Sequence, residues 1–349
     1  MKICITWDGL ASYAEASIKK FIAITDHDVS VVASVPEVPK TTGDSILGVA
    51  INWIPRRYEG SIKDIIGAVP DVLVQGGWFL PAFSRFGDEV RKNGGKVVVA
   101  IDNQFIWGWK LLPWILRFVF KFRRKFDGYL IPGKSTAKLL RWCGVPKWRI
   151  AQGLYTADPQ VFTNGGPLER RPKKMLYIGR FIGLKNVIRM LQAFADFARE
   201  HPDWELHCYG QGNLQQEMER IIGERNCKSI VLHEFVQPVE LAELYKQARV
   251  LVLPSLWDHW GVVVHEATLS GCALLVSDRV GVGWNLCTKS NGLRFNPFRK
   301  ESLHVSLSKI ADWDDAMWRR AQNESLRVAK TVSPDVFASE LAGLICRLS

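Results

Sequence analysis

Short apolar runs of β-forming residues alternate with longer helical patterns along most of this chain of 349 residues. Nearly continuous apolar runs are typical of strands buried on both faces of a parallel sheet. The runs are residues 3–6, 29–34, 72–74, 96–101 and 128–131 in the first half, and 175–178, 205–209, 229–232, 250–253 and 273–276 in the second. Helical stretches such as 187–200 and 214–225 lie between them. The alternation, which occurs twice, predicts an α/β protein with doubly wound parallel sheets.

A segment rich in Gly, Pro and polar residues (163–167) separates the two halves and has the composition of a linker. We expect an N-terminal Rossmann-like domain over residues 1–165 and a second over 174–330. The C-terminal helix expected in 331–349 would pack back on the first domain. Ligands of such sheets bind at the carboxyl ends of the strands, so two facing domains would enclose a binding cleft.

Composition narrows the class of protein. The apolar fraction of 47% and the charged fraction of 23% exclude a disordered or collagen-like chain. No uncharged apolar stretch reaches about 18 residues, so we expect no transmembrane helix. The cysteines are scattered without a CxxC pair, and the N-terminus lacks the features of a signal peptide, so we expect a cytoplasmic protein with reduced thiols.

Positive charge is concentrated in the N-terminal half. The chain has a net charge of +11, and residues 1–168 hold 22 Lys and Arg against 14 Asp and Glu. This asymmetry indicates an anionic partner for that half, either a membrane surface or nucleic acid.

One segment of the second half combines two acids with a glycine at the start of a helix. Asp258, Gly261 and Glu266 follow Pro254-Ser255 at the end of a predicted strand. The N-terminus of a helix presents free N–H groups and the positive end of its dipole, which favours a bound phosphate. Gly261 lets the backbone approach a ligand closely, and a carboxylate there can accept two hydroxyls of a sugar or ribose. The segment predicts a site for a phosphorylated sugar or nucleotide.

A second loop places two cations after the strand at 175–178. Arg180 and Lys185 flank a tight turn that begins at Gly179. Arg can bond two phosphate oxygens at once, while Lys acts as a point charge. The pair would stabilise the negative charge on a leaving diphosphate. Gly210, in a Gly-x-Gly turn after the next strand, belongs to the same candidate site.

These segments resemble the signature of retaining glycosyltransferases of family 4 (glycosyl transferases group 1), which have the GT-B fold. The likeness rests on the spacing from Pro254-Ser255 to Glu266-Ala267, on the Gly-Arg…Lys loop and on Ser-Asn-Gly-Leu at 290–293. It covers residues 128–300 well and the first 127 poorly. Asp258 stands where the family usually has Glu, and the shorter side chain could alter which donor sugar is held.

The resemblance implies that the second domain binds a nucleotide-diphosphate-sugar. Glu266 would hold the ribose hydroxyls, and Asp258 would contact hydroxyls of the donor sugar. Arg180 and Lys185 would bind the diphosphate. The other donor-binding candidates are Gly210, Trp260, Gly261 and Val262, of which the last three would contribute backbone N–H groups. Family members mostly need no metal, so we expect neither a metal nor a cofactor apart from the donor itself.

Candidate acceptor residues follow strands of the first half. Asp102 comes after the strand at 96–101, where related enzymes often place a His, and would accept a hydroxyl proton or orient the acceptor. Alternatively, it is an ordinary acid in the turn that ends the strand. Asp8 after the first strand and the loop at 75–78 are further candidates.

Residues 107–126 contain six cations and no acid. At 100° per residue, the side chains that fall on one arc are Leu111, Trp114, Ile115, Phe118, Val119, Phe122 and Phe126. Those on the flank beyond it are Lys110, Arg117, Lys121 and Arg124. This pattern is typical of a helix that lies in the interface of an anionic membrane. The alternatives are a core-facing helix with a solvated basic face and a nucleic-acid site, for which no recognised motif is present.

The combined interpretation is a hexosyltransferase-type glycosyltransferase (EC 2.4). It would move a sugar to a hydroxyl of a lipid-linked or surface-polysaccharide acceptor (lipopolysaccharide, O-antigen or capsule) with retention of configuration. It would act as a peripheral protein on the cytoplasmic face of the inner membrane. The alternatives are a GT-B nucleotide-sugar epimerase or hydrolase, and a nonenzymatic basic membrane-binding protein on a GT-B scaffold.

Overall fold

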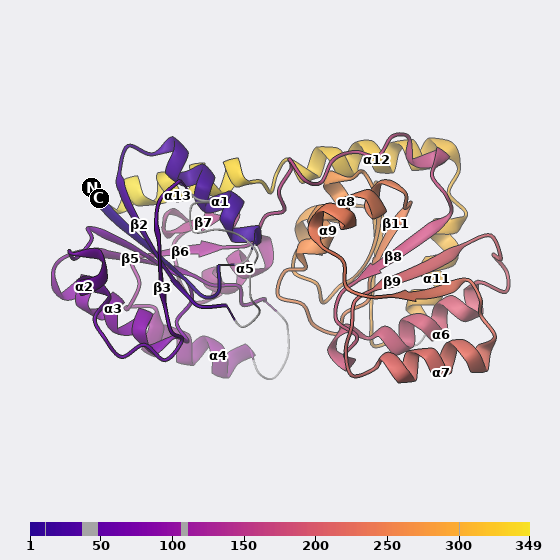
Figure 1. Cartoon of the computed structure of the whole chain (residues 1–349), viewed down its shortest axis with the longest axis horizontal. Helices are drawn as coiled ribbons and strands as arrows, with labels where there is room; N and C mark the ends of the chain where they lie inside the picture. The colour runs from indigo at the N-terminus through magenta and orange to yellow at the C-terminus, as the bar shows by residue number, and fades with distance from the viewer. Residues whose placement is uncertain (11, 37–47, 106–110, 300) are drawn as a thin grey trace. The chain divides into compact units, whose positions relative to one another are not determined.

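A computed structural model describes residues 1–10, 12–36, 48–105, 111–299 and 301–349. The chain divides into two compact units (Figure 1). Unit 1 comprises Met1–Thr156 together with Val332–Ser349, and unit 2 comprises Ala157–Thr331. The chain therefore crosses between the units twice, once after Thr156 and once after Thr331.

Unit 1 contains a parallel sheet of seven strands in the order β3-β2-β1-β4-β5-β6-β7. The strands are β1 (Lys2–Trp7), β2 (Asp28–Ser34), β3 (Ile51–Ile54), β4 (Val72–Gln75), β5 (Lys96–Ala100), β6 (Gly128–Ile131) and β7 (Ile150–Gln152). The central strands are buried on both faces, which is why they appear in the sequence as continuous apolar runs.

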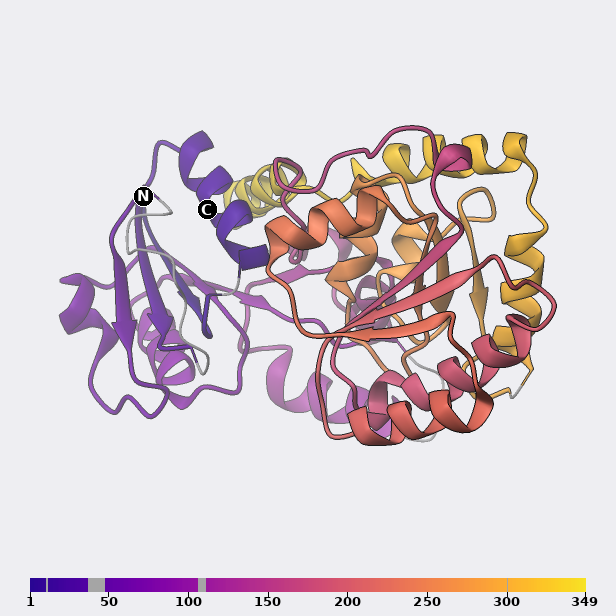
Figure 2. The same ribbon diagram turned by 45° about the vertical axis from the view of Figure 1, so that its right-hand side comes forward.

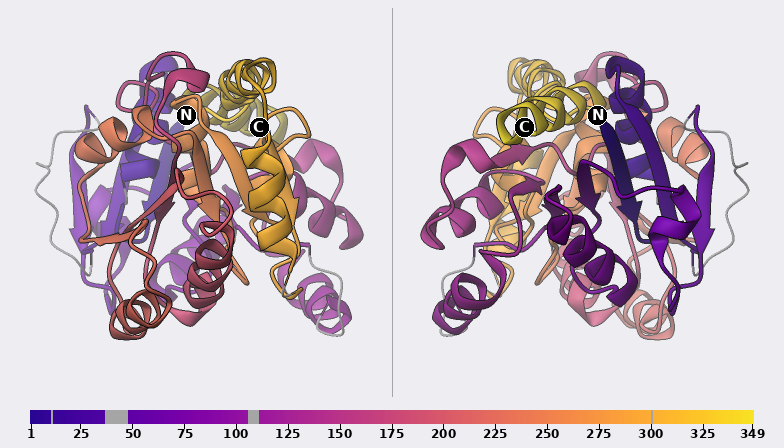
Figure 3. Two further views of the ribbon diagram at one scale, coloured as in Figure 1. Left: turned by 90° about the vertical axis from the view of Figure 1, so that its right-hand side faces the viewer. Right: turned by 90° about the vertical axis from the view of Figure 1, so that its left-hand side faces the viewer.

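Helices cover both faces of this sheet (Figure 1). On one face, α1 (Ser12–Ile24) and α13 (Pro334–Leu348) share a core with Ile5 and Val31. The opposite face is covered by α2 (Ile62–Ile66), α3 (Pro81–Lys92), α4 (Leu111–Arg117), the π-helix η1 (Phe118–Phe122) and α5 (Lys134–Trp142). Figure 3 shows α4 on the side of the sheet away from α1 and α13.

Unit 2 contains a parallel sheet of six strands in the order β10-β9-β8-β11-β12-β13. The strands are β8 (Lys174–Ile178), β9 (Glu205–Tyr209), β10 (Ile230–His233), β11 (Val250–Leu253), β12 (Ala273–Ser277) and β13 (Gly292–Phe295). The helices are α6 (Val187–Phe197), α7 (Gln215–Arg225), α8 (Pro238–Lys246), α9 (Val262–Leu269), α10 (Gly283–Leu286), α11 (Ser302–Ala311) and α12 (Asp315–Ala329). Figures 1 and 2 show α6, α7 and α11 on one face of the sheet and α8, α9 and α12 on the other.

All ten predicted strands are present, within one or two residues of their predicted ends. The strands that the sequence did not predict are β3, β7 and β13, and each lies at an edge of its sheet. An edge strand is paired on one side only and tends to be less buried, so its sequence often lacks a long apolar run. The fourth edge strand, β10, was predicted.

The predicted linker at 163–167 is wrong, because these residues are part of unit 2. The buried Arg171 guanidinium holds the segment in place by donating hydrogen bonds to Asn164 Oδ1 and the Gly166 carbonyl, both at 3.1 Å. Gly and polar residues therefore form a fixed turn here, and the crossing between the units occurs earlier, at Thr156 and Ala157.

The helix predicted over 107–126 also differs from the structure. Residues 106–110, which include the predicted surface residue Lys110, lie outside the described part of the chain. From Leu111, α4 runs to Arg117 and continues as the π-helix η1, in which the Arg123 N–H bonds to the Phe118 carbonyl at 2.8 Å. The predicted apolar arc faces the protein core: Phe118 and Phe126 are buried, and Trp114, Ile115, Val119 and Phe122 pack against the same cluster. The arc is therefore not the surface that would meet a membrane.

Within the described residues, the structure contains no helix with both the length and the apolar character needed to cross a bilayer.

Candidate functional site

The two loops singled out in the second half meet at one point of the unit 2 sheet. Strands β8 and β11 are neighbours, and from this pair the chain order runs outwards in both directions. This is the topological switch point, where the loops that follow two adjacent strands diverge and leave room for a ligand. The loop after β8 carries Arg180 and Lys185, and the loop after β11 carries Asp258. We call Arg180, Lys185, Asp258, Gly261 and Glu266 the switch-point cluster.

Hydrogen bonds join the two loops directly. The Leu256 N–H donates to the Leu184 carbonyl at 2.9 Å, and the Asn186 side chain donates to the Pro254 carbonyl at 3.2 Å. The Lys185 ammonium forms an ion pair with Asp258 at 2.5 Å, and each side chain is only 16% exposed. The sequence predicted Lys185 for the diphosphate and Asp258 for the sugar, and the structure brings these two groups into contact.

Glycines allow the close backbone approaches at this point. Gly261 has a φ of +89° immediately before α9, and a Cβ there would lie 2.9 Å from Val280 Cγ1. A Cβ on Gly210 would lie 2.0 Å from the Gly179 carbonyl oxygen. Gly210, predicted as a donor-binding residue, therefore has a clear packing role, because it lets the loops after β8 and β9 touch.

The polar groups of the cluster differ in exposure. Arg180 is exposed, while the Trp260 side chain is 4% exposed, so Trp260 has little more than its backbone to offer a ligand. The first N–H groups of α9, at Val262 and Val263, have no acceptor within the helix. The cluster thus combines an exposed cation with a helix N-terminus, which is a suitable environment for an anion.

Glu266 is oriented by a residue that the sequence did not single out. The Tyr245 hydroxyl on α8 lies 3.0 Å from Glu266 Oε2 and donates a hydrogen bond to it. Burial raises the pKa of Glu266 to about 7, and the hydrogen bond from Tyr245 opposes this shift only in part. Glu266 is therefore a carboxyl group that changes charge near neutral pH, held in one orientation.

His265, the neighbour of Glu266 on α9, is completely buried. Its Nδ1 accepts a hydrogen bond from the Ala157 N–H at 2.8 Å, and its Nε2 donates to the Ala329 carbonyl at 3.1 Å. These partners lie at the beginning of unit 2 and near its end. Burial lowers the pKa of His265 to about 4, so the ring is neutral and links α9 to both terminal segments of the unit.

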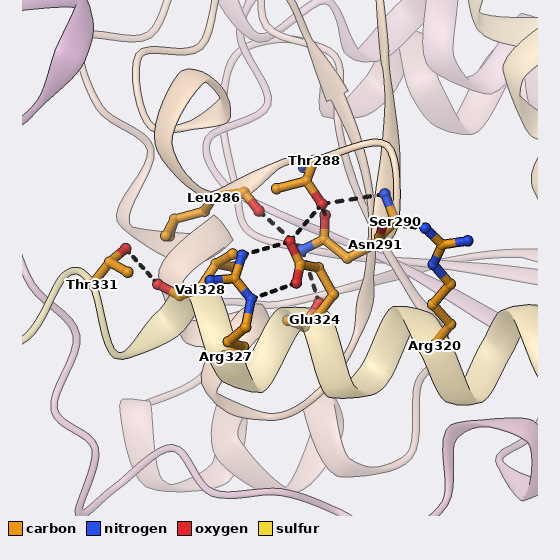
Figure 4. Close-up of polar contacts among 10 residues, drawn as sticks. Leu286, Thr288, Ser290, Asn291, Arg320, Glu324, Arg327, Val328 and Thr331 are labelled. Carbon is orange, nitrogen blue, oxygen red and sulfur yellow. Dashed lines mark hydrogen bonds and ion pairs between the residues drawn. The ribbon is translucent and has the colours of Figure 1, made fainter.

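Hydrogen bonds anchor the Ser-Asn-Gly-Leu motif at 290–293 within unit 2 (Figure 4). The completely buried Asn291 side chain donates to the Leu286 carbonyl at 2.9 Å and to Ser325 Oγ at 3.1 Å, and it accepts from the Thr288 N–H at 2.7 Å. Thr288 in turn donates to Glu324 at 3.0 Å. The motif therefore fastens the loop before β13 to α12.

The strongest candidate site in unit 1 is a cavity of about 180 Å³ at the switch point of its own sheet, between the ends of β1 and β4. We call it the unit 1 cavity. Its lining residues are Trp7, Asp8, Gly76, Gly77, Trp78, Phe79, Ala100, Ile101, Asp102, Asn103 and Tyr155. Asp8, Asp102 and the Gly-Gly-Trp part of the predicted loop at 75–78 therefore lie together. The lining comes from four separate segments, and its aromatic residues Trp7, Phe79 and Tyr155 were not predicted as site residues.

The two carboxylates of the unit 1 cavity differ in their surroundings. Asp8 forms an ion pair with Arg56 and accepts a hydrogen bond from Ser34. Partial burial raises the pKa of Asp8, but the bonds from Arg56 and Ser34 and the Arg56 charge outweigh it, so the pKa falls below its usual value. Asp102 accepts a hydrogen bond from the Tyr155 hydroxyl at 3.2 Å. Asp8 is thus held by a cation, and Asp102 receives a hydrogen bond from a neutral phenol group.

Within the described ranges, no group of three His, Cys, Asp or Glu is arranged to hold a metal ion. The predicted surface residues Arg117, Lys121 and Arg124 are all exposed on α4, on η1 and just after it.

Comparison with known proteins shows that most of unit 2 is similar to glycosyltransferases. Residues 163–323 match the family model described as Glycosyl transferases group 1, and this range includes the whole switch-point cluster. The alpha-D-kanosaminyltransferase of Streptomyces kanamyceticus is 27% identical over 184 residues, which are 51% of this chain and 46% of that protein. The chain therefore matches this curated relative over about half the relative's length.

Solved structures match the whole chain. The sucrose-phosphate synthase of Thermosynechococcus elongatus superposes with a TM-score of 0.72 at 16% identity, covering 100% of this chain and 99% of that one. HepE of Anabaena, solved in complex with UDP and glucose, superposes with a TM-score of 0.71 at 12% identity and covers 99% of both chains. With its two parallel-sheet units, the chain has the GT-B fold, as its sequence predicted.

Proposed function

We propose that the protein transfers a sugar from a nucleotide-diphosphate-sugar to a hydroxyl group of an acceptor, as a retaining glycosyltransferase of family 4. The observation that carries this proposal is the switch-point cluster. The Lys185–Asp258 ion pair and two hydrogen bonds join the loops that follow two adjacent strands. Arg180 lies on the first of these loops, and the second leads into the N-terminus of α9, which carries Glu266. The family match across these loops and the UDP complex of a protein with the same fold support a nucleotide donor.

Each group of the cluster has a proposed part in binding the donor. Arg180 and the first N–H groups of α9 bind the diphosphate, and Lys185 adds its charge while paired with Asp258. Glu266, oriented by Tyr245, accepts hydrogen bonds from the two ribose hydroxyls. Asp258 accepts a hydrogen bond from a hydroxyl of the donor sugar.

The proposed reaction breaks the bond between the anomeric carbon and the diphosphate oxygen and forms a bond from that carbon to the acceptor oxygen. The electron pair of the broken bond remains on the diphosphate, whose added charge Arg180 and Lys185 stabilise. The acceptor hydroxyl loses its proton to Asp102 in the unit 1 cavity. The resident groups thus act by positioning and by electrostatics, with no metal ion or further cofactor.

The acceptor is proposed to be a lipid-linked or surface-polysaccharide glycan. The unit 1 cavity is lined by Trp7, Trp78, Phe79 and Tyr155 as well as by two carboxylates. Aromatic faces can pack on the apolar faces of a sugar ring while carboxylates accept its hydroxyl groups. The charge excess in the first half of the chain fits action at the cytoplasmic face of the inner membrane.

A thermal-shift screen with UDP-, GDP- and dTDP-sugars tests the donor proposal. A bound donor raises the unfolding midpoint by mass action, so one nucleotide series should stabilise the protein. Glu266→Gln keeps the shape of the side chain and should weaken the shift strongly. Glu217→Gln, a partly exposed residue on α7 outside the cluster, is the matched control and should leave it unchanged. The proposal fails if no nucleotide shifts the midpoint, or if both variants respond like the wild type.

A further inference from the structure

The outer side of α4 and η1 carries three exposed apolar side chains. Leu112, Leu116 and Phe120 follow one another at intervals of four residues and are 63%, 48% and 82% exposed. We call these three residues the apolar ridge. Single exposed apolar residues are common on protein surfaces, but three neighbours on one short helical segment indicate a surface with a partner.

Exposed cations accompany the ridge. Arg117, Lys121, Arg123 and Arg124 are exposed, and within the described residues none of them pairs with a carboxylate, whereas the adjacent Lys125 lies 3.6 Å from Asp88. Around this segment, residues 103–157 hold eleven Lys and Arg against the single acid Asp127. The segment that bears the ridge therefore carries four exposed positive charges, which attract an anionic surface.

The inner side of the segment is firmly packed. The Trp114 and Phe118 rings stack with centroids 5.2 Å apart, and Phe122 stacks on Trp78 with centroids 4.8 Å apart. The segment cannot turn these aromatic residues outwards without dismantling part of the core. The apolar ridge is therefore the side that is free to meet a partner.

Trp78 connects this segment to the unit 1 cavity, because the same ring stacks on Phe122 and lines the cavity. A surface docked on the ridge would thus lie close to the proposed acceptor site.

We propose that the apolar ridge and its four cations dock unit 1 on an anionic lipid surface. Leu112, Leu116 and Phe120 enter the boundary between headgroups and acyl chains, and the cations bind the headgroup phosphates. Nucleic acid has no apolar layer that could receive the side chains of the apolar ridge. A lipid surface can contact both the apolar ridge and the four cations. Docking itself requires no donor and does not depend on the proposed function. Only the idea that docking brings a lipid-linked acceptor to the unit 1 cavity rests on the proposed function.

Flotation with lipid vesicles tests the proposal. The 349-residue chain should bind vesicles of phosphatidylcholine and phosphatidylglycerol at low salt, and bind pure phosphatidylcholine weakly. Leu116→Ser with Phe120→Ser should weaken binding about a hundredfold, because two buried apolar side chains are lost. Arg117→Gln with Lys121→Gln and Arg124→Gln should weaken binding about fivefold per residue and reduce its dependence on salt.

Matched variants in unit 2 serve as controls. Val239→Ser removes an apolar side chain on α8 whose exposure, 72%, lies between those of Leu116 and Phe120. Lys228→Gln with Lys309→Gln and Lys330→Gln removes three exposed cations. Neither control should change vesicle binding. Equal losses in the controls would overturn the assignment of the surface to α4 and η1.

A fluorescent label locates the contact directly. Cys346 is the exposed cysteine among seven, so Cys346→Ser leaves six buried thiols as background. An environment-sensitive dye on Phe120→Cys in this background should shift to the blue with anionic vesicles, while the same dye on Val239→Cys should not.

Two further outcomes would overturn the docking proposal: a wild type that binds no anionic vesicles at low salt, or one that binds duplex nucleic acid but not vesicles. Titration with the nucleotide that the thermal-shift screen identifies distinguishes failure of the docking proposal from failure of the proposed function. Ridge variants that keep their nucleotide affinity have a folded unit 2. A wild type that binds vesicles but no nucleotide would contradict the proposed function alone.

Discussion

The switch-point cluster of unit 2 and the cavity of unit 1 occupy the same place in two sheets of the same kind, but they are built differently. The cluster is formed mainly by two loops, one after β8 and one after β11, and its polar groups are charged side chains and backbone N–H groups. The cavity draws its lining from four segments of chain and combines four aromatic side chains with two carboxylates. The same topology therefore carries two candidate sites that are built from different kinds of groups.

The difference shows which sites can be recognised in a sequence. A diphosphate requires cations and a helix N-terminus at short, defined spacing, so the cluster appears as a local pattern. An aromatic cavity requires only that separate side chains converge, and any one of them has the sequence context of an ordinary core residue.

The largest expected effect is on kcat, from a substitution in unit 1 that should leave donor binding by unit 2 unchanged. Asp102→Asn keeps the size of the side chain but removes the proposed base, so kcat should fall about 10²–10⁴-fold. The nucleotide affinity of unit 2 should not change, as measured by calorimetric titration. Asp64→Asn, an exposed acid on α2, is the control and should retain full kcat. A fully active Asp102→Asn variant would make Asp102 a simple turn residue at the end of β5.

The next effect acts on unit 2 alone. Arg180→Ala with Lys185→Ala removes two charged contacts to the diphosphate, and affinity for the nucleoside diphosphate should fall about a hundredfold. Affinity for the corresponding nucleoside monophosphate should fall less, because it lacks the second phosphate. Lys309→Ala should behave like the wild type. Equal affinity in the wild type and the double variant would place the phosphates elsewhere.

The third prediction concerns the pH dependence of unfolding. The folded-state pKa of His265, about 4, lies below its ordinary 6.5, so its contribution to stability is lost as the pH falls from about 6.5 to 4. The folded-state pKa of Glu266, about 7, lies above its ordinary 4.5, so its contribution is lost as the pH rises from about 4.5 to 7. Each change amounts to about 3 kcal/mol, and in the wild type the two largely cancel.

Substitution of either residue should reveal the other's contribution in urea unfolding curves. Relative to the wild type, Glu266→Gln should lose about 3 kcal/mol on acidification from pH 7 to 4, because only the His265 contribution is left. His265→Gln should show the opposite slope relative to the wild type. Parallel pH profiles for the wild type and both variants would mean that neither pKa is shifted by burial.

The smallest effect tests whether the motif at 290–293 is purely structural. Asn291→Ala leaves the Leu286 carbonyl and the Thr288 N–H without their buried partner, which should lower the free energy of unfolding by about 2 kcal/mol. Nucleotide affinity should be unchanged at a temperature where the variant is folded. A selective loss of affinity would instead assign the motif to the donor site.

Much of the fold followed from the sequence, because strands buried on both faces and the helices between them have local signatures. Three of the four edge strands, β3, β7 and β13, were not predicted, because short strands paired on one side only have weak local signatures. In the site, Arg180, Lys185, Asp258 and Glu266 were predicted from spacing. Tyr245, which orients Glu266, was not, because its position on α8 gives no sign of which helix lies beside it.

By itself, the sequence determined the parallel α/β architecture, the loops that follow the strands and the concentration of positive charge, because each depends on neighbouring residues. The tertiary structure decided which groups meet. It paired Lys185 with Asp258, brought Asp8 and Asp102 to one cavity and joined His265 to Ala157 and Ala329. It also turned the predicted apolar arc of α4 and η1 inwards and left Leu112, Leu116 and Phe120 exposed. Helical periodicity identifies the faces of a helix, but only the surrounding core determines which of two apolar faces is buried.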